Sequence, residues 1–256
     1  MKTEWLGRNK EKEALRKKVW TYLSENNLVY TNPFNEIPDF IGREQAAAQL
    51  MSSNIWKRSN VIKCNPDNAQ LPLRIAAVKE GKTLYMAVPQ LVDENCFFKF
   101  SQEIIEAQNW KIEDALRWDF ALENAPKVSF KEMQAIDLVI VGCVAASLDG
   151  VRIGKGGGFA DIELGLLRYY HLINDKTPIG TTIHDSMLLD KGLIPHQTHD
   201  SLLNIIATPT KVYQTEVEQN QPGGINWDEL LHDQLEDIPI LEIVKKEIQE
   251  SNHGQL

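Results

Sequence analysis

Short apolar runs alternate with helix-like segments along this 256-residue chain. Runs of four to eight apolar residues bounded by turn residues are typical of buried strands, and apolar positions three or four apart indicate helices. The predicted strands cover residues 60–63, 83–88, 137–144, 178–184 and 204–208. The predicted helices cover residues 9–24, 42–52, 71–80 and 159–172. This alternation predicts an α/β fold with a mostly parallel sheet.

The first predicted helix carries an apolar stripe and a pair of basic residues. The stripe is formed by Ala14, Leu15, Val19, Tyr22 and Leu23. Lys12 and Arg16 lie one helical turn apart and so share a face. A solvated basic face is the commoner arrangement, and a clamp on phosphate oxygens is the alternative.

Two parts of the chain show a weaker pattern. Residues 96–131 mix polar and apolar positions without a clear period, and residues 27–40 form an Asn- and Pro-rich loop. The tail contains Pro222-Gly223-Gly224 and ends in polar residues. We therefore expect one domain over residues 1–215 and a partly flexible C-terminal extension over residues 216–256.

Composition narrows the range of partners. A net charge of −9 argues against a general nucleic-acid or anionic-membrane surface. Cys64, Cys96 and Cys143 are too far apart for a metal or disulfide motif, which favours a reducing cytoplasm. The first residues carry charges and no apolar leader, and no apolar run approaches membrane-spanning length.

The most informative stretch reads R-I-G-K-G-G-G-F-A-D over residues 152–161. It follows the apolar run and a turn at Leu148-Asp149-Gly150, and it precedes a helix. Glycines allow backbone amides to approach a ligand, and a helix N-terminus attracts anions. With Arg152 and Lys155 this pattern favours polyphosphate binding over a plain flexible turn. Asp161 in the first helical turn suits the helix dipole, and it could also hold Mg²⁺ beside bound phosphates.

Two His-Asp dipeptides follow later predicted elements, His184-Asp185 and His199-Asp200. Such histidines are more often loop residues with ordinary hydrogen bonds than bases or metal ligands. Asp200 could nevertheless supply a second carboxylate for the cation that Asp161 would need.

Together these features resemble the 5-formyltetrahydrofolate cyclo-ligase family. The resemblance covers residues 9–215 and rests on 12–16, 137–141, 152–161, 199–200 and 203–211. It is nearest to the branch described as synthetase domain-containing, with Gly224-Ile-Asn-Trp227 as a further similarity. It implies a three-layer α/β/α fold like that of ribose-5-phosphate isomerase and CoA transferases. It also implies ATP and Mg²⁺ as cofactors and a reduced folate as substrate, for a monomer or small homo-oligomer.

The resemblance further implies a role for each matching residue. Lys12, Arg16, Arg152, Gly154, Lys155, Gly156, Gly157 and Gly158 would bind ATP. Arg152 and Lys155 would also act in catalysis, and Asp161 and Asp200 would hold magnesium. Asn65, Asp67 and Phe159 would face the substrate. In the family reaction the formyl oxygen of 5-formyltetrahydrofolate takes the γ-phosphoryl group, and ring closure gives 5,10-methenyltetrahydrofolate.

The sequence departs from the family on the folate side. The usual aromatic-aromatic-Asp-Arg becomes Phe159-Ala160-Asp161-Ile162, and the usual Glu, Asp and Thr are replaced by residues 65–70, where only Asp67 is acidic. A different formylated or pterin-like acceptor therefore remains an alternative, as does a non-catalytic nucleotide- or folate-binding protein. The two retained aspartates favour an enzyme over a pure binder.

Overall fold

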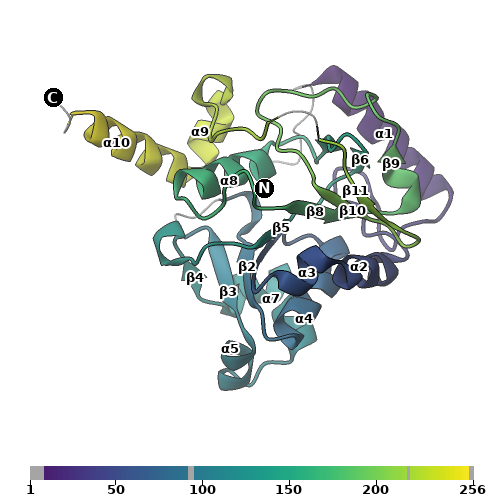
Figure 1. The fold of residues 1–256 in the computed structure, drawn as a ribbon, viewed down its shortest axis with the longest axis horizontal. Helices are drawn as coiled ribbons and strands as arrows, with labels where there is room; N and C mark the ends of the chain where they lie inside the picture. The colour runs from purple at the N-terminus through teal and green to yellow at the C-terminus, as the bar shows by residue number, and fades with distance from the viewer. Residues whose placement is uncertain (1–8, 92–94, 218–219, 254–256) are drawn as a thin grey trace.

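The computed structural model describes residues 9–91, 95–217 and 220–253. The first eight residues, for which we predicted no apolar leader, lie outside these ranges. An eight-stranded sheet in the order β11-β10-β8-β5-β1-β2-β3-β4 forms its centre (Figure 1). The inner pairs from β10 to β2 are parallel, and the outer pairs with β11, β3 and β4 are antiparallel. Its strands are β1 Val61–Cys64, β2 Thr83–Ala87, β3 Phe97–Phe100, β4 Lys127–Val128, β5 Leu138–Ile140, β8 Ile179–Thr182, β10 Ile205–Ala207 and β11 Val212–Gln214.

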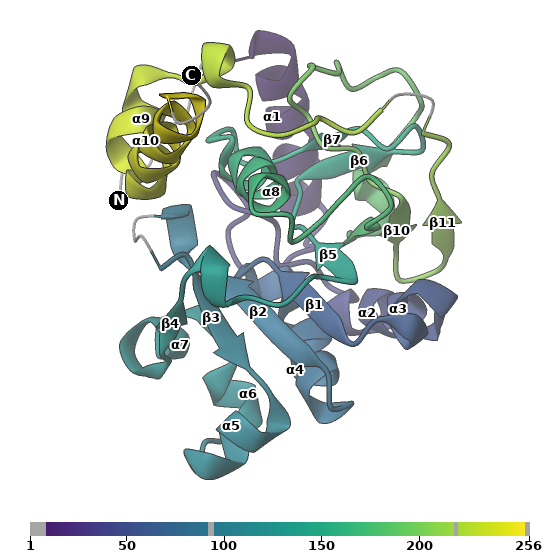
Figure 2. The same ribbon diagram turned by 60° about the vertical axis from the view of Figure 1, so that its left-hand side comes forward.

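Helices cover both faces of this sheet, which confirms the predicted α/β/α layering (Figure 2). One face carries α2 Arg43–Ser52, α3 Asn54–Arg58, α4 Leu71–Lys79, α5 Gln102–Ala107, α6 Ile112–Ala115 and α7 Trp118–Asn124. The other carries α1 Lys10–Glu25, α8 Phe159–Tyr169 and α10 Pro239–His253.

The two-residue period of the strands divides their side chains between two cores. Ile62 and Cys64 of β1 pack among the helices of the α2–α7 face, and so do Leu138 and Ile140 of β5. Val139 points to the opposite core with α8. Because successive side chains of a strand point to opposite faces, a run that is apolar at every position must be covered on both sides.

A second sheet corrects one sequence prediction. The apolar run 137–144 was predicted as a single strand, but β5 ends at Ile140 and the chain enters a three-stranded sheet in the order β7-β6-β9. Its strands are β6 Ala145–Ser147, β7 Arg152–Ile153 and β9 Leu188–Leu189. The predicted turn at 148–150 closes the β6–β7 hairpin, with Gly150 at a φ of 87°. The glycine-rich loop, residues 154–158, therefore follows β7. The apolar residues of this run are buried in both sheets, so burial alone does not reveal where the chain passes from one sheet to the other.

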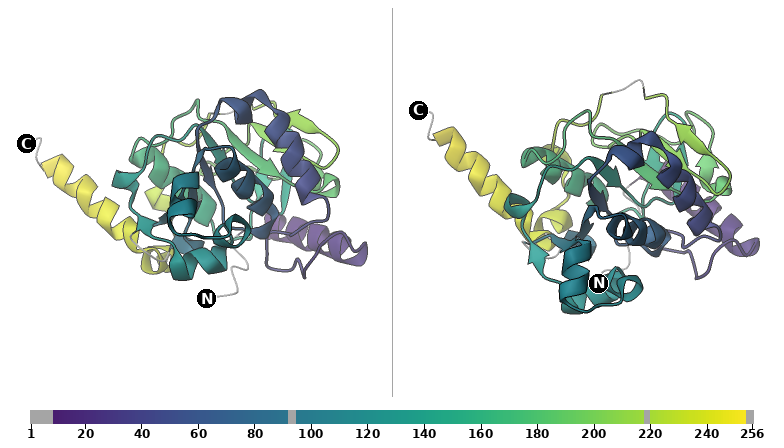
Figure 3. Two further views of the ribbon diagram at one scale, coloured as in Figure 1. Left: turned by 90° about the horizontal axis from the view of Figure 1, so that it is seen from below. Right: turned by 60° about the horizontal axis from the view of Figure 1, so that its bottom comes forward.

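The weakly patterned regions also acquire structure. Residues 96–131 contain β3, β4 and three short α-helices. In the extension, a 3-10 helix at Trp227–Glu229 is followed by α9 His232–Asp237 and by α10, which reaches outward from the body in Figure 3. Ile240, Leu241 and Val244 nevertheless anchor α10 in the core beside α8. No helix in the described ranges is both long and apolar enough to span a membrane.

Candidate functional site

The candidate site lies at the carboxyl ends of β1 and β5. Asn65 and Asp67 directly follow β1, and the glycine-rich loop that follows β7 reaches the same edge. In parallel sheets ligands bind beyond the carboxyl ends of the strands. The topology thus brings together the nucleotide and substrate segments that the sequence analysis had assigned separately.

The glycine loop has a backbone that only glycine adopts readily. Gly156 has a φ of 117° and Gly158 a φ of 74°. Gly158 is the N-cap of α8, and its carbonyl accepts from the amides of Asp161 and Ile162 at 3.1 Å each. The helix begins at Phe159, as predicted, so its positive dipole end follows the loop directly.

Lys12 and Arg16 lie on the buried face of α1, which corrects the prediction of a solvated basic face. Lys12 is 6% exposed and Arg16 is 5% exposed, whereas Tyr22 of the predicted apolar stripe is 50% exposed. The Arg16 Nε donates to the Gly154 carbonyl at 2.7 Å, and its guanidinium pairs with Glu13 at 2.8 Å. Burial lowers the pKa of Arg16, and Glu13 opposes this effect. The guanidinium therefore binds the glycine loop directly.

Each predicted magnesium ligand is paired with a predicted phosphate ligand. The Lys12 Nζ lies 2.5 Å from Asp200 Oδ2, and an Arg152 guanidinium nitrogen lies 2.5 Å from Asp161 Oδ1. The backbone amide of Ser201 also donates to Asp161 Oδ1 at 3.0 Å. Because Ser201 follows Asp200, this hydrogen bond draws the two aspartate-bearing segments together.

This donor set fits a magnesium ion that arrives with phosphates. Within the ranges that the structure describes, no cluster of three or more His, Cys, Asp or Glu side chains could hold a metal. Mg²⁺ commonly binds one or two carboxylates together with substrate phosphate oxygens and water. Asp161 and Asp200 are the residues that would supply the carboxylates.

Lys155 extends from the loop toward two carboxylates. Its Nζ lies 3.1 Å from Glu36 Oε2 and 3.8 Å from Asp67 Oδ1. Burial works to lower the pKa of Lys155, but Asp67 and Glu36 outweigh it and raise the pKa. Lys155 thus stays charged where the glycine loop approaches Asp67.

A buried ion pair beneath the site escaped the sequence analysis. Lys63 of β1 pairs with Glu163 of α8, and its Nζ also donates to Asn65 Oδ1 at 2.6 Å. Burial raises the pKa of Glu163, while Lys63 and Arg152 oppose the rise. A lysine inside V-I-K-C and a glutamate inside I-E-L-G-L-L are charges in apolar runs, and that signal could have indicated them.

Gln70 and Arg74 make buried hydrogen bonds at residues 65–70, the segment predicted to face the substrate. A guanidinium nitrogen of the fully buried Arg74 donates to the carbonyls of Asn65 at 2.6 Å and Asp67 at 2.9 Å. Gln70 Nε2 donates to Thr182 Oγ1 at 3.3 Å, and its Oε1 has no hydrogen-bond partner among the described residues. The Arg74 contacts fix the backbone of residues 65–67, which lead into a 3-10 helix over Asn68–Gln70.

The remaining predicted residues lie at the margin of the site. Phe159 is half-buried and packs against the core, and Ile162, in the place of the family's arginine, is part of that core. The His199 ring pairs with Glu229 of the extension. The His184 Nδ1 accepts from the Ser186 amide at 3.1 Å, and burial lowers the pKa of that ring.

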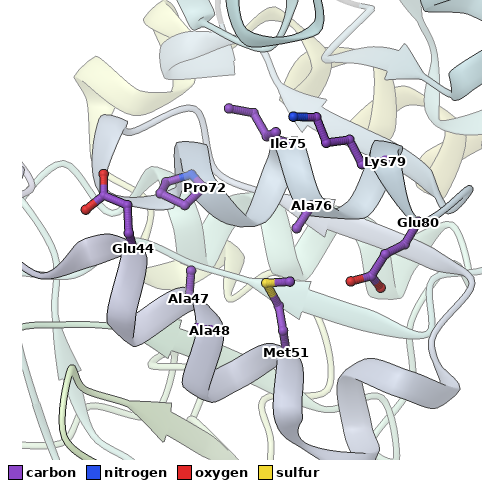
Figure 4. Close-up of a pocket in the computed structure, with 9 residues that line it drawn as sticks. All are labelled: Glu44, Ala47, Ala48, Met51, Pro72, Ile75, Ala76, Lys79 and Glu80. Atoms are coloured by element: carbon purple, nitrogen blue, oxygen red, sulfur yellow. The ribbon is translucent and has the colours of Figure 1, made fainter.

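An apolar pocket between α2 and α4 lies apart from these groups (Figure 4). Ala47 and Met51 on α2 face Ala76 on α4, with Glu44 and Lys79 at the rim. It contains none of the residues predicted to bind nucleotide, metal or substrate. The candidate chemistry therefore belongs to the edge formed by the glycine loop and the ends of β1 and β5.

Comparison with known proteins identifies the family of this chain. The sequence model of the 5-formyltetrahydrofolate cyclo-ligase family matches residues 8–209. A methenyltetrahydrofolate synthase domain-containing protein from Danio rerio is 32% identical over 252 residues, which are 96% of this chain and 64% of that protein. The corresponding protein from Homo sapiens is 29% identical over 242 residues, covering 94% of this chain and 63% of that protein. The chain thus spans less than two thirds of the length of these relatives.

A solved structure extends the likeness to the fold. The NMR structure of Aquifex aeolicus 5,10-methenyltetrahydrofolate synthetase superimposes with a TM-score of 0.50 and 19% sequence identity. The match covers 81% of this chain and 94% of that one. The part of this chain beyond residue 209 lies outside the region matched by the family model.

Proposed function

The chain belongs to the 5-formyltetrahydrofolate cyclo-ligase family, and we propose that it converts 5-formyltetrahydrofolate to 5,10-methenyltetrahydrofolate with ATP and Mg²⁺. One observation carries this proposal. Arg16 bonds the Gly154 carbonyl of the glycine loop, and the side chain of the next residue, Lys155, lies 3.8 Å from Asp67 Oδ1. A polyphosphate held by the loop would therefore lie beside the segment assigned to the folate.

The proposed roles follow from charge and position. The amides of the loop, the N-terminus of α8 and the side chains of Lys12, Arg16, Arg152 and Lys155 would bind the triphosphate. Asp161 and Asp200 would orient Mg²⁺, which supplies charge neutralisation at the transferring phosphoryl group. The Lys12–Asp200 and Arg152–Asp161 pairs keep these charges compensated in a largely buried site.

The reaction needs positioning more than covalent help from the protein. The formyl oxygen forms a bond to the γ-phosphorus while the bond to the ADP oxygen breaks. N10 would then attack the activated carbon and close the ring, and phosphate would leave with the former formyl oxygen and take up the proton from N10. Lys155 and Arg152 would stabilise the negative charge that develops on the phosphoryl oxygens.

The test is an absorbance assay with matched variants. The protein is mixed with Mg-ATP and 5-formyltetrahydrofolate, and the near-ultraviolet band of the methenyl product is followed. We expect Lys155→Ala and Asp161→Asn to lower kcat/KM by about two orders of magnitude or more, as for the loss of a charge that stabilises the transition state. Lys79→Ala removes an exposed lysine of the opposite face and should have no effect. A flat trace from folded wild-type protein would reject the proposal.

The departure over residues 65–70 supports a second candidate, an ATP-dependent enzyme of this family that acts on another formylated or pterin-like molecule. Asp67 is the only acid in this segment, and the side-chain oxygen of Asn65 is already bonded to Lys63 Nζ at 2.6 Å, so the groups offered to an acceptor differ from those of the family. ADP release stimulated by such a molecule, and not by 5-formyltetrahydrofolate, would favour it. Tight Mg-ATP binding without turnover of any acceptor would instead indicate a binding protein.

A further inference from the structure

The C-terminal extension lies beyond residue 209, where the region matched by the family model ends. In the fold it nevertheless contacts the site. The side-chain amide of Gln221 bonds the amide of Leu202 at 3.0 Å and its carbonyl at 2.8 Å. Glu229 accepts from Thr198 Oγ1 at 2.8 Å and pairs with His199. The loop that carries Asp200 is therefore held by the extension, and α9 lies beside α8 in Figures 1 and 2.

Gln234 of α9 makes the contact that bears on the glycine loop. Its Nε2 donates to the carbonyl of Gly157 at 2.8 Å, and its Oε1 accepts from the amide of Leu231 at 3.0 Å. The residue is only 6% exposed. Because the Leu231 amide occupies the oxygen, the nitrogen is the end that faces Gly157.

The shape of the loop is matched to this side chain. A Cβ atom added at Gly158 would lie 2.8 Å from Gln234 Nε2, closer than a real side chain allows. The positive φ of Gly158 independently disfavours any other residue. The bare backbone of Gly158 therefore lets Gln234 pack directly against the loop.

The hydrogen bond between Gln234 and Gly157 favours one orientation of a peptide group in the loop. The peptide between Gly157 and Gly158 has glycine on both sides, so its two possible orientations are both sterically accessible. In a trans peptide the C=O and N–H point in opposite directions. A carbonyl held toward Gln234 therefore directs the Gly158 N–H away from α9, whereas the flipped peptide would turn the carbonyl oxygen that way.

We propose that Gln234 is a positioning residue of the nucleotide site, which holds the Gly157–Gly158 peptide with its N–H toward the phosphates. The inference rests on the proposed function, because it takes the loop as the ATP site. On this inference the extension contributes a side chain that orients the loop of the nucleotide site. Loss of Gln234 removes the hydrogen bond that favours this orientation, and in the flipped peptide the carbonyl oxygen would repel phosphate oxygens.

Two substitutions separate this role from a purely structural one. Gln234→Glu keeps the size and the acceptor for Leu231, but it places a carboxylate oxygen against the Gly157 carbonyl. Gln234→Ala removes both contacts. Glu247→Gln is the matched control, because Glu247 lies in the same extension and bonds Lys131, Tyr169 and Tyr170 instead of the loop.

The measurements are calorimetric titration with Mg-ATP, steady-state kinetics and the thermal unfolding temperature. We expect Gln234→Ala to weaken Mg-ATP binding by about threefold to tenfold, the range for one neutral hydrogen bond. Gln234→Glu should weaken it by more than about tenfold, because a charge is added beside the phosphates. The KM for ATP should rise in both variants while the KM for the folate and the behaviour of Glu247→Gln stay unchanged.

Wild-type affinity in both Gln234 variants would overturn the inference, as would equal changes in both KM values. Tighter ATP binding in Gln234→Ala would also overturn it, because the extension would then obstruct the site. Failure of the wild-type protein to bind Mg-ATP is a separate result, which rejects the proposed function and the inference with it.

Discussion

Lys12 and Asp200 are 188 positions apart in the chain, yet their side chains form a buried ion pair with 2.5 Å between Nζ and Oδ2. The amide of Gln197 donates to the same oxygen at 2.8 Å. The pair joins the first turn of α1 to the loop that precedes β10. One cation and one anion that were predicted to bind different parts of Mg-ATP are therefore each other's partners in the free protein.

Removing one member of this pair should be costly. Lys12→Met leaves the Asp200 carboxylate buried without its counter-charge, and we expect a loss of about 3–5 kcal/mol in the free energy of unfolding. The double variant Lys12→Met/Asp200→Asn should recover most of that loss, because no buried charge is then left. Urea unfolding of the wild type, Lys12→Met, Asp200→Asn and the double variant gives the coupling energy. Additive losses would contradict the buried pair.

Glu163 should give the stability a distinct pH dependence. Burial raises its pKa in the folded protein above the ordinary 4.5, so the native state binds the proton more tightly than the unfolded chain. Its contribution is therefore largest below pH 4.5 and falls as the pH rises through the raised value. Relative to Glu163→Gln, the wild-type protein should lose stability over that window in urea titrations.

Glu113 provides the control for this measurement. It is exposed on the opposite face, and its hydrogen bond with Lys79 lowers its pKa. A lowered carboxyl pKa contributes stability above the ordinary value that is lost as the pH falls, so Glu113→Gln should show a weak dependence of the opposite sign. A wild-type advantage over Glu163→Gln that grows with pH would refute the prediction for Glu163.

Gly142 should not tolerate a side chain. A Cβ atom there would lie 2.5 Å from Asp67 Oδ2 and 3.1 Å from Gln70 Oε1, and Gln70 is fully buried. We expect Gly142→Ala to destabilise the protein by about 1–3 kcal/mol, as for other overpacked sites. Gly223→Ala is the matched control, because nothing lies within 4 Å of its added Cβ. Equal unfolding midpoints for the two variants would show that Asp67 moves aside freely.

The three cysteines should be unreactive in the folded protein. Cys64, Cys96 and Cys143 are all buried, and burial raises the pKa of Cys64 and of Cys143 to about 11. Since the thiolate is the reactive form, iodoacetamide at pH 8 should leave the native protein unlabelled by mass spectrometry. The same reaction in urea should add three labels. Labelling of any thiol within minutes under native conditions would be inconsistent with this burial.

The local pattern was sufficient for several elements of the fold. β1, β2, β8 and β10 fall within the predicted apolar runs or within one residue of them. The helix that starts at Phe159 follows from Gly158, whose positive φ ends the loop. These elements depend on side-chain period and turn chemistry, which are properties of neighbouring residues. Periodicity alone would have put Lys12 and Arg16 in solvent, whereas the family resemblance assigned them to the nucleotide, an assignment that stays a prediction.

Tertiary structure alone decided how the charges are arranged. Lys12 is buried because Asp200 reaches it, Lys63 because Glu163 covers it from α8, and the Gly157 carbonyl is bonded because Gln234 returns from the extension. The partners in each case are separated by tens to nearly two hundred residues, and a buried polar group is stable only when its partner is present. Sequence by itself determined β1, β2, β8 and β10, the glycine loop and the start of α8. The partner of each buried charge depended on how those elements pack, because packing sets the distances between residues remote in the chain.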